Sequence, residues 1–354
     1  MANDVLDSIL KQNSIDAVFI TDPYSLRYYT GFRGGEGYAF ATSKGSRVLI
    51  TDSRYTEAAG KESSYEVIEY NMERRLSAII REMIEKDEVQ RIGFEDETVT
   101  FSQYMQFKEY IDGELVPLKD ELKKPRQIKT PEEIELLRKA EHIGDLAFKD
   151  ILGILRPGLT ELEVAAELEY SMKKHGASGF SFDTIAASGM NSSMPHAIPS
   201  TKKLEKGDFL TMDFGCIYEG YCSDMTRTVC IGKADDDQKK IYNIVLDAQL
   251  AVLDRLRPGM TCKQVDSIAR DMITEAGYGE YFGHGLGHSV GLYIHESPAF
   301  NRRDESIVRP GMIETDEPGI YLPGRFGVRI EDMILITETG CESLAASPKE
   351  LIEL

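Results

Sequence analysis

The feature that most constrains the fold of this 354-residue chain is an internal repeat. The stretch LRPGLTELEVAAELEYSMKKHGA begins at Leu155, and the similar stretch LRPGMTCKQVDSIARDMITEAGY begins at Leu256. In each, a Thr is followed three residues later by Glu or Gln, which is the signature of a capping box at a helix N-terminus. Each stretch also ends close to a glycine of the kind that follows a helix C-terminus, Gly176 and Gly277. The sequence therefore predicts the same helix in two corresponding places.

Further landmarks follow each copy in the same order. Pro195-His196 corresponds to Ile294-His295, and Thr-x-Asp-x-Gly at 211–215 corresponds to Thr-x-Glu-x-Gly at 315–319. Several ordered matches at a nearly constant offset are hard to obtain by chance. We therefore expect two copies of one α/β unit, at about 130–235 and 236–345, packed about a pseudo-two-fold axis.

The first third of the chain has a different pattern, in which short apolar runs alternate with amphipathic stretches. We expect strands at 17–20, 37–42, 46–51, 65–70 and 91–96, and helices at 25–30, 53–59, 75–86 and 102–111. Charged residues and Pro125 then break the pattern, and Thr130-Pro131-Glu132-Glu133 opens a long helix. The predicted fold class is therefore α/β (α+β), with an N-terminal domain at 1–124 and a second domain at 125–354.

Composition excludes several classes of partner and compartment. The formal net charge of −19 argues against nucleic acid or an anionic membrane as the main partner. The N-terminal MANDVLDSIL lacks the basic and apolar regions of a signal peptide, and we find no apolar run long enough to span a membrane. The five cysteines form no C-x-x-C pair. These observations predict a cytoplasmic protein with reduced thiols.

Two acids lie close together in TMDFGCIYEGYCSDMTRT, residues 211–228, which has the pattern of a β-hairpin. A turn at 218–219 places Asp213 directly opposite Asp224, and a turn at 219–220 places them diagonally. Side chains alternate with a period of two, so both acids lie on the same face in either case. Like charges facing each other destabilise a sheet, so the pair requires a shared proton, a cation or exposure to water. The apolar flanking residues favour a cation.

The repeat supplies two more acids. Glu317 corresponds to Asp213, and Glu331 corresponds to Asp224 with a shift of a few residues. Four carboxylates that converge at the pseudo-two-fold axis carry a charge of −4. Two divalent cations would neutralise them, and nothing else in this acidic chain obviously could.

Histidines are concentrated beside these acids. The glycine-rich stretch GHGLGHSVGLYIHESP contains His284, His288 and His295, and His196 is a fourth. Neutral imidazole is a common metal ligand. Oxygen donors with one nitrogen favour Mn²⁺, with Co²⁺, Fe²⁺ or Zn²⁺ as alternatives. Two such metals lower the pKa of a water molecule and so make a site for hydrolysis.

These residues resemble a known family. The segments SGMNSSMPHAIPS, KGDFLTMDFGCIYEGYCSDMTRT, GHGLGHSVGLYIHESP and TDEPGIYLPGRFGVRIED are similar to those of the pita-bread metallopeptidases, which include prolidase, aminopeptidase P and methionine aminopeptidase. The segments YYTGFRGGEGYAFAT and TDSRYTEAA resemble the creatinase/prolidase-type N-terminal domain, which methionine aminopeptidases lack. The resemblance covers nearly the whole chain.

The resemblance implies a role for each candidate residue. It implies five metal ligands: Asp213, Asp224, His288, Glu317 and Glu331. It implies that Glu317 also transfers a proton, that His196 and His295 steady the reacting peptide, and that substrate-binding or supporting positions are His284, Tyr321 and Arg329. Asp316 departs from the family pattern, and its neighbour Glu317 should point to the opposite face of the strand, so we do not expect Asp316 to be a ligand.

The implied activity is metal-dependent hydrolysis of a peptide bond that precedes proline. Two versions remain open: a prolidase takes Xaa-Pro dipeptides, whereas an aminopeptidase P removes the first residue from longer peptides with proline second. A homodimer is a further expectation from the family. The alternative from another class is a catalytically inactive binding or scaffold protein with the same fold, which retention of all five ligands disfavours.

Overall fold

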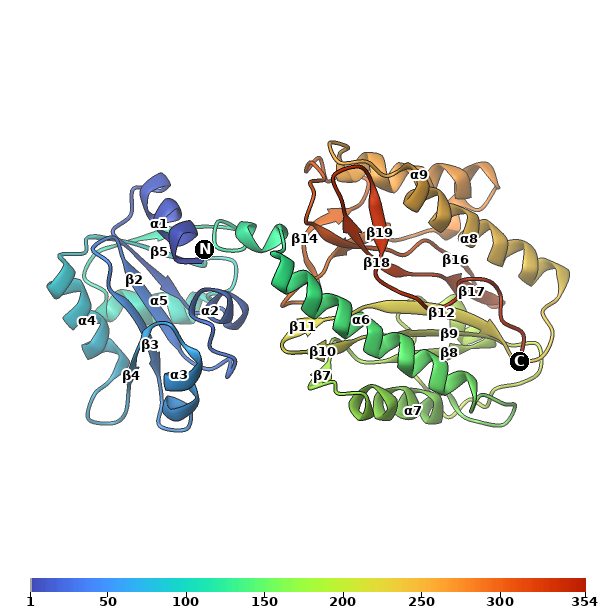
Figure 1. Ribbon diagram of the computed structural model, residues 1–354, viewed down its shortest axis with the longest axis horizontal. Coiled ribbons are helices and arrows are strands. Elements are labelled where there is room, and N and C mark those ends of the chain that lie inside the picture. The colour runs from blue at the N-terminus through green and yellow to red at the C-terminus, as the bar shows by residue number, and fades with distance from the viewer. Residues whose placement is uncertain (1) are drawn as a thin grey trace. The chain divides into compact units, whose positions relative to one another are not determined.

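The structure, a computed structural model, describes residues 2–354 and divides into two compact units, Met1–Arg126 and Gln127–Leu354 (Figure 1). Both units contain helices packed on sheets, which confirms the predicted α/β class. The boundary expected between residues 124 and 125 lies within a short 3-10 helix, η1 (Lys124–Gln127).

The first unit is built on a six-stranded sheet with the strand order β4-β3-β2-β1-β5-β6. The strands are β1 (Ala17–Ile20), β2 (Tyr38–Thr42), β3 (Arg47–Thr51), β4 (Glu66–Glu69), β5 (Arg91–Phe94) and β6 (Glu114–Pro117). The helices are α1 (Ala2–Gln12), α2 (Pro23–Thr30), α3 (Thr56–Glu62), α4 (Leu76–Asp87) and α5 (Phe101–Tyr110). The sequence pattern predicted all of these except α1 and β6.

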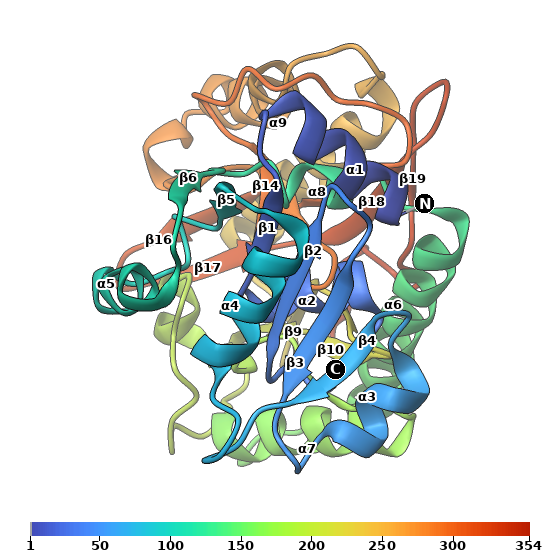
Figure 2. The same ribbon diagram turned by 90° about the vertical axis from the view of Figure 1, so that its left-hand side faces the viewer.

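Alternation along the central strand β1 explains why helices cover both faces of this sheet. Val18 and Ile20 pack with apolar residues of α1, α2 and α3. Ala17 and Phe19 pack with residues of α4 and α5 on the other face. In Figure 2, α4 lies in front of this sheet. A strand with two apolar faces is buried on both, as its uninterrupted apolar sequence requires.

The second unit spans both stretches that we expect to be copies of one α/β unit, called the first and second copy below. The first copy has α6 (Pro131–Leu152), α7 (Glu161–Lys174), β7 (Gly179–Phe180), β8 (Ile185–Ser188), η2 (Gly189–Ser193), β9 (Phe209–Phe214), β10 (Cys216–Tyr218), β11 (Tyr221–Cys222) and β12 (Met225–Cys230). The second has α8 (Asp236–Arg255), α9 (Cys262–Glu275), η3 (Gly279–Tyr281), β13 (Gly287–Ser289), β14 (Glu296–Phe300), β15 (Ile313–Asp316), β16 (Gly319–Leu322), β17 (Phe326–Arg329), β18 (Asp332–Ile336) and β19 (Cys341–Ser343). In Figure 1, α6 and α7 lie below α8 and α9.

The helix boundaries follow the local signals in the sequence. Thr130, Thr160 and Thr261 each accept a hydrogen bond from the backbone three residues on, and each forms a complete capping box. Gly176 and Gly277 have φ of 110° and 88°, a left-handed conformation that glycine adopts without strain. The predicted starts and ends of the repeated helices are confirmed.

The two copies meet where β12 lies next to the start of β18. One sheet has the order β12-β9-β8 and the other has the order β14-β13-β15-β18-β19. They join where the Glu331 N–H donates to the Thr226 carbonyl over 3.1 Å. On β9, Leu210 and Met212 pack against α6 and α7, so Asp213 points away from these helices. The functional side chains therefore gather on the face that the helices leave open.

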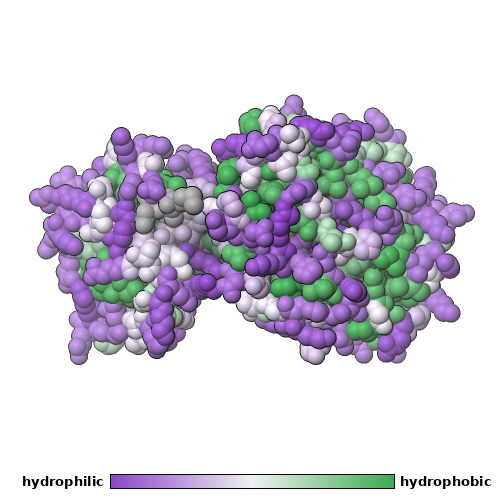
Figure 3. Space-filling model, in the orientation of Figure 1, coloured by the Kyte–Doolittle hydropathy of each residue, from purple (hydrophilic) through white to green (hydrophobic). Residues whose placement is uncertain are grey.

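The face of the molecule seen in Figure 3 carries both hydrophilic and apolar side chains. Hydrophilic side chains predominate on the first unit in Figure 3, and apolar ones show between them on the second. Within residues 2–354, no helix is both long enough and apolar enough to cross a membrane. All five cysteines are free thiols.

A buried arginine on β12 binds residues of the second copy at the place where the two copies meet. Arg227, only 1% exposed, forms an ion pair with Asp332 over 2.8 Å and donates to the Glu331 carbonyl over 2.6 Å. It also donates to the carbonyls of Ser347 and Pro348, which ties the C-terminal segment to β12 and β18.

We expect Arg227→Met to lower the free energy of unfolding by about 3–5 kcal/mol, because it leaves a buried carboxylate without one of its partners. Urea unfolding measures the change. Arg138→Met is the matched control: its ion pair with Glu342 is exposed to solvent, so its loss should cost less than about 0.5 kcal/mol. Equal effects of the two substitutions would contradict the role given to Arg227.

Candidate metal centre

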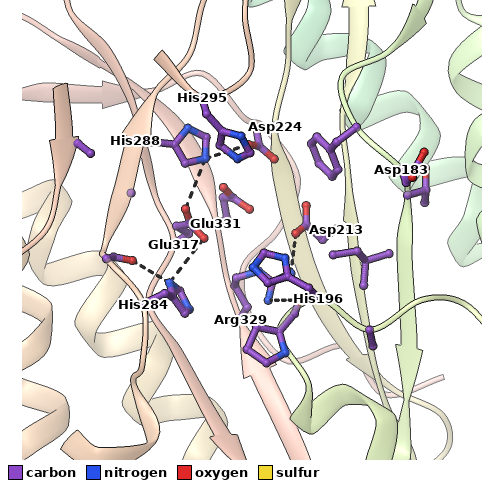
Figure 4. Close-up of a pocket in the computed structure, with 18 of the residues that line it drawn as sticks. Asp183, His196, Asp213, Asp224, His284, His288, His295, Glu317, Arg329 and Glu331 are labelled. Carbon is purple, nitrogen blue, oxygen red and sulfur yellow. Dashed lines mark hydrogen bonds and ion pairs between the residues drawn. The ribbon is translucent and has the colours of Figure 1, made fainter. Parts of the chain in front are cut away.

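Side chains from both copies line a cavity of about 650 Å³ (Figure 4). Nine of the ten predicted site residues line it, and they are His196, Asp213, Asp224, His284, His288, His295, Glu317, Arg329 and Glu331. The tenth, Tyr321, hydrogen-bonds to two of these residues. Asp316 does not line the cavity. The fold thus brings together residues that are far apart in the sequence.

The hairpin register places the first two acids diagonally. Asp213 on β9 is directly opposite Thr226 on β12, and the turn is Glu219-Gly220. The alternative with Asp213 directly opposite Asp224 is wrong. Both turn residues have positive φ, 46° and 80°, and a two-residue hairpin turn of this kind favours glycine at its second position. The turn therefore starts one residue later than that alternative requires.

Four of the predicted ligands crowd around one point. Ligand atoms of Asp224, His288 and Glu331 all lie within 4.8 Å of one another. His288 Nε2 is 3.5 Å from Asp224 Oδ2 and 3.6 Å from Glu317 Oε1. This spacing is what a shared cation requires, since each side chain can offer one atom to the same centre.

The positively charged side chains near the cavity do not neutralise all of its carboxylates. Burial, followed by repulsion from neighbouring carboxylates, raises the pKa of Asp224 and of Glu331 well above the ordinary range. Burial also raises the pKa of Glu317 to about 8. The buried Oδ1 of Asp213 has no hydrogen-bond partner within residues 2–354. These residues fit divalent cations, because a cation would restore the charged forms and bind the unpaired oxygen.

His288 is arranged as a neutral ligand. Its Nδ1 lies 3.3 Å from the Ser289 carbonyl, which can only accept, so Nδ1 carries the proton and the lone pair of Nε2 faces the acids. Burial, followed by the neighbouring His295, lowers the pKa of His288 to about 4. An uncharged imidazole at neutral pH is the form that binds a metal.

A chain of hydrogen bonds connects Asp213 to His284. Arg329 pairs with Asp213 Oδ2 over 2.5 Å and donates to the Tyr321 hydroxyl over 2.8 Å. That hydroxyl donates to His284 Nε2 over 2.9 Å, because His284 Nδ1 already donates to the Gly285 carbonyl over 2.7 Å. Burial lowers the pKa of His284 to about 4, so its ring is also neutral. Arg329, Tyr321 and His284 therefore behave as one connected unit.

His196 and His295 lie on the side of the cavity that remains open to solvent. The rings of His288 and His295 contact each other edge to face, with centroids 4.6 Å apart. Burial and the nearby His196 lower the pKa of His295. Both rings are accessible from the cavity, so either could contact a bound molecule.

Two threonines that the sequence reasoning missed support the ligands. Thr226 donates to Glu331 Oε2 over 2.5 Å and accepts from Arg329 Nε over 3.0 Å. Thr315 donates to Glu317 Oε1 over 3.2 Å and accepts the His288 N–H over 3.0 Å. Thr226 is two residues from Asp224, and Thr315 is two residues from Glu317. Side chains two apart lie on the same face of a strand, so this spacing could have predicted that both threonines lie beside the ligands.

Comparison with known proteins identifies the family. The model of metallopeptidase family M24 matches residues 135–338, and that of the creatinase/prolidase N-terminal domain matches residues 4–128. The chain belongs to metallopeptidase family M24, as the sequence resemblance predicted.

Solved structures and curated relatives agree with this assignment. An Xaa-Pro dipeptidase from Bacillus anthracis is 45% identical and superposes with a TM-score of 0.96 over 100% of this chain and 99% of that one. An X-Pro aminopeptidase from Thermotoga maritima MSB8 is 39% identical, with a TM-score of 0.93 over 100% and 99% of the two chains. An Xaa-Pro dipeptidase from Pyrococcus furiosus is 41% identical over 98% of each chain.

In metal-free buffer with EDTA, we expect the free energy of unfolding to fall between pH 6.5 and about 8. The pKa of Glu317 is about 8 in the folded protein against an ordinary 4.5, so the folded state binds more protons and loses stability as they leave. His284 and His288 oppose this fall only near its start, because they are neutral in the folded state and their unfolded forms, with a pKa of about 6.5, have lost most of their protons by about pH 7.5. Urea unfolding at several pH values measures it.

Two controls accompany this measurement. Glu317→Gln should weaken the dependence on pH, although Asp224 and Glu331, whose pKa values are also raised, still contribute. Saturating Mn²⁺ should weaken it as well, because it stabilises the ionised carboxylates. Stability that stays constant or rises across this interval in EDTA would contradict the electrostatic account of the site.

Proposed function

We propose that this protein hydrolyses the peptide bond between an N-terminal residue and a proline in second position. The observation that carries the proposal is the convergence of the five candidate ligands on one cavity, namely Asp213, Asp224, His288, Glu317 and Glu331. The relatives named as Xaa-Pro dipeptidase and X-Pro aminopeptidase support it.

The five candidate ligands would hold two divalent cations. When bound, these cations would polarise the scissile carbonyl and lower the pKa of a water molecule. Four carboxylates and one imidazole form an oxygen-rich donor set, so we propose Mn²⁺ first, with Co²⁺, Fe²⁺ or Zn²⁺ as alternatives.

The protein's own side chains would move protons and hold the peptide. We assign Glu317 the transfer of a proton from the attacking water to the leaving proline nitrogen. His196 and His295 reach the same cavity, and we assign them hydrogen bonds to the carbonyl oxygen as its negative charge develops. The connected unit of Arg329, Tyr321 and His284 holds Asp213 in place and borders the pocket for substrate.

The cavity also offers apolar surface for a proline ring. Phe182, Ile185 and Pro195 line it beside the polar groups. A small, rigid and apolar ring would bury surface there without leaving an unsatisfied polar group. This combination suits a substrate with proline beside the bond that is cleaved.

The proposal extends to location and assembly. We infer a cytoplasmic homodimer: five free thiols support a reducing compartment, and the family resemblance supports the dimer. Light scattering on the purified protein tests the assembly, and a molar mass of one chain would contradict it.

The test is hydrolysis of Ala-Pro and of Ala-Pro-Ala with added Mn²⁺, followed by release of the products, with Asp224→Asn as the control. We expect the wild type to cleave at least one of the two peptides and Asp224→Asn to lose at least about 100-fold in kcat, because it removes a ligand charge at a hydrolytic metal site. Cleavage of the dipeptide alone identifies a prolidase, and cleavage of the tripeptide after its first residue identifies an aminopeptidase P.

Wild type and Asp224→Asn that are equally inert on both peptides would overturn the proposal. The inactive scaffold would then be the better interpretation. Metal analysis by mass spectrometry separates the two cases further, because the proposal requires two cations per chain and a scaffold requires none.

A further inference from the structure

One of the two exposed histidines in the cavity depends on its backbone for its position. His196 lies in the loop of residues 189–199, called the His196 loop below, which follows β8. Within residues 2–354, the His196 ring makes no hydrogen bond, whereas the His284 ring makes two. The place of the His196 ring therefore follows from how the His196 loop is held.

A single buried carboxylate joins the two ends of the His196 loop. Glu161, the first residue of α7, is 0% exposed. Its Oε1 accepts from the Ser188 N–H over 2.7 Å and the Ser188 hydroxyl over 2.8 Å. Its Oε2 accepts from the Ser200 hydroxyl over 2.6 Å and the Ser200 N–H over 3.1 Å. The Asn191 amide, inside the loop, donates to both oxygens.

The His196 loop is also fixed on its other side, against the second copy. The Gly327 N–H on β17 donates to the Ser192 hydroxyl over 2.9 Å. A Cβ at Gly327 would lie 2.1 Å from the Ser192 carbonyl oxygen, so the loop and β17 touch backbone to backbone. Arg329 donates to the Pro195 carbonyl over 3.4 Å. The His196 loop is therefore held on one side by Glu161 and on the other by β17, the strand that carries Arg329.

The ordinary role of an acid at a helix N-terminus does not account for Glu161. The start of α7 is already capped by Thr160, which forms a capping box with Glu163. The Glu161 carboxylate instead receives hydrogen bonds from residues that bracket or belong to the His196 loop. Hydrogen bonds to a charged carboxylate are strong, so these contacts fix Glu161 and the residues that donate to it relative to one another.

The second copy holds its own histidine segment with different residues. Arg270 on α9 pairs with the buried Asp266 and donates to the carbonyls of Phe282 and His284 over 3.0 and 2.7 Å. Asp266 also accepts the Leu286 N–H. In both copies, then, the second helix carries a buried charged group that holds a segment with a cavity histidine.

We propose that Glu161 is a positioning residue that sets the location of His196 against the reacting peptide. This inference rests on the proposed function. Glu161 does not line the cavity and does not touch the candidate metal ligands, so its effect on the reaction passes through the His196 loop.

The test is Glu161→Gln. This substitution keeps the shape of the side chain, but it replaces one carboxylate oxygen with an NH₂ group, which cannot accept the hydrogen bonds that Ser188, Asn191 and Ser200 donate. We expect kcat on the Xaa-Pro substrate to fall by about 10- to 100-fold, because a misplacement of about 1 Å can lower a rate about 100-fold. The metal content should stay at the wild-type value. Loss of metal, or an unchanged kcat, would overturn the proposal.

A double-mutant cycle shows whether Glu161 acts through His196. In a His196→Ala background, Glu161→Gln should cause no further loss of kcat, since the group that it positions is gone. If Glu161→Gln lowered kcat by the same factor with and without His196, Glu161 would act independently of His196. That result would indicate a general structural role and would contradict the proposal. Glu95→Gln is the matched control: Glu95 is a buried carboxylate that accepts two backbone N–H groups in the first unit, and this substitution should leave kcat unchanged.

Milder variants and a second measurement guard against misfolding. Ser188→Ala and Ser200→Ala each remove one hydroxyl from Glu161 and keep the backbone donors, so each should give a smaller loss of kcat than Glu161→Gln. Amide hydrogen exchange should speed up at residues 188–200 in Glu161→Gln and stay at wild-type rates in α8 and α9. Unchanged exchange in this loop would refute the inference even in a protein without peptidase activity, whereas an inactive wild type refutes only the proposed function.

Discussion

Repulsion among four carboxylates, of which Asp224 and Glu331 are buried and Asp213 and Glu317 partly buried, is the interaction around which the catalytic unit is arranged. Asp213, Asp224, Glu317 and Glu331 come from two copies of one unit and face the same cavity. Arg329, the one arginine among residues 2–354 that lines this cavity, pairs with Asp213. The pKa of each of the other three is raised by burial before any other cause. A fold that keeps them together without cations is storing free energy that divalent metal binding would release.

The fold keeps the carboxylates together because hydrogen bonds and packing fix the place where the two copies meet. The backbone bridge from Glu331 to Thr226 sets the spacing of the copies, and Arg227 holds it from within the core. Apolar residues of β9 point to α6 and α7 and thereby turn Asp213 to the open face. Packing on one face of a strand thus decides where charge is placed on the other.

The residues of the site are held in place in two different ways. Strands carry the candidate metal ligands or flank them, and the threonines beside them on these strands hold the carboxylates in place. His196 stands on a loop instead, and hydrogen bonds from Ser188 and Ser200 to the buried Glu161 join the two ends of that loop. The candidate ligands are thus placed on or beside strands, whereas His196, to which we assign contact with the substrate, is placed on a loop that buried hydrogen bonds hold.

The sequence by itself determined the features that depend on neighbours along the chain. These are the duplication, the capping boxes at Thr160 and Thr261, and the common face of Asp213 and Asp224, and the family motifs added the five candidate ligands. It left the hairpin register open between two turns. Only the tertiary structure decided that register and revealed Thr226, Arg227 and Glu161 as supports. The physical reason is that caps and alternation act over a few residues, whereas a hydrogen bond such as that from Thr226 to Glu331 exists only after both copies have packed together.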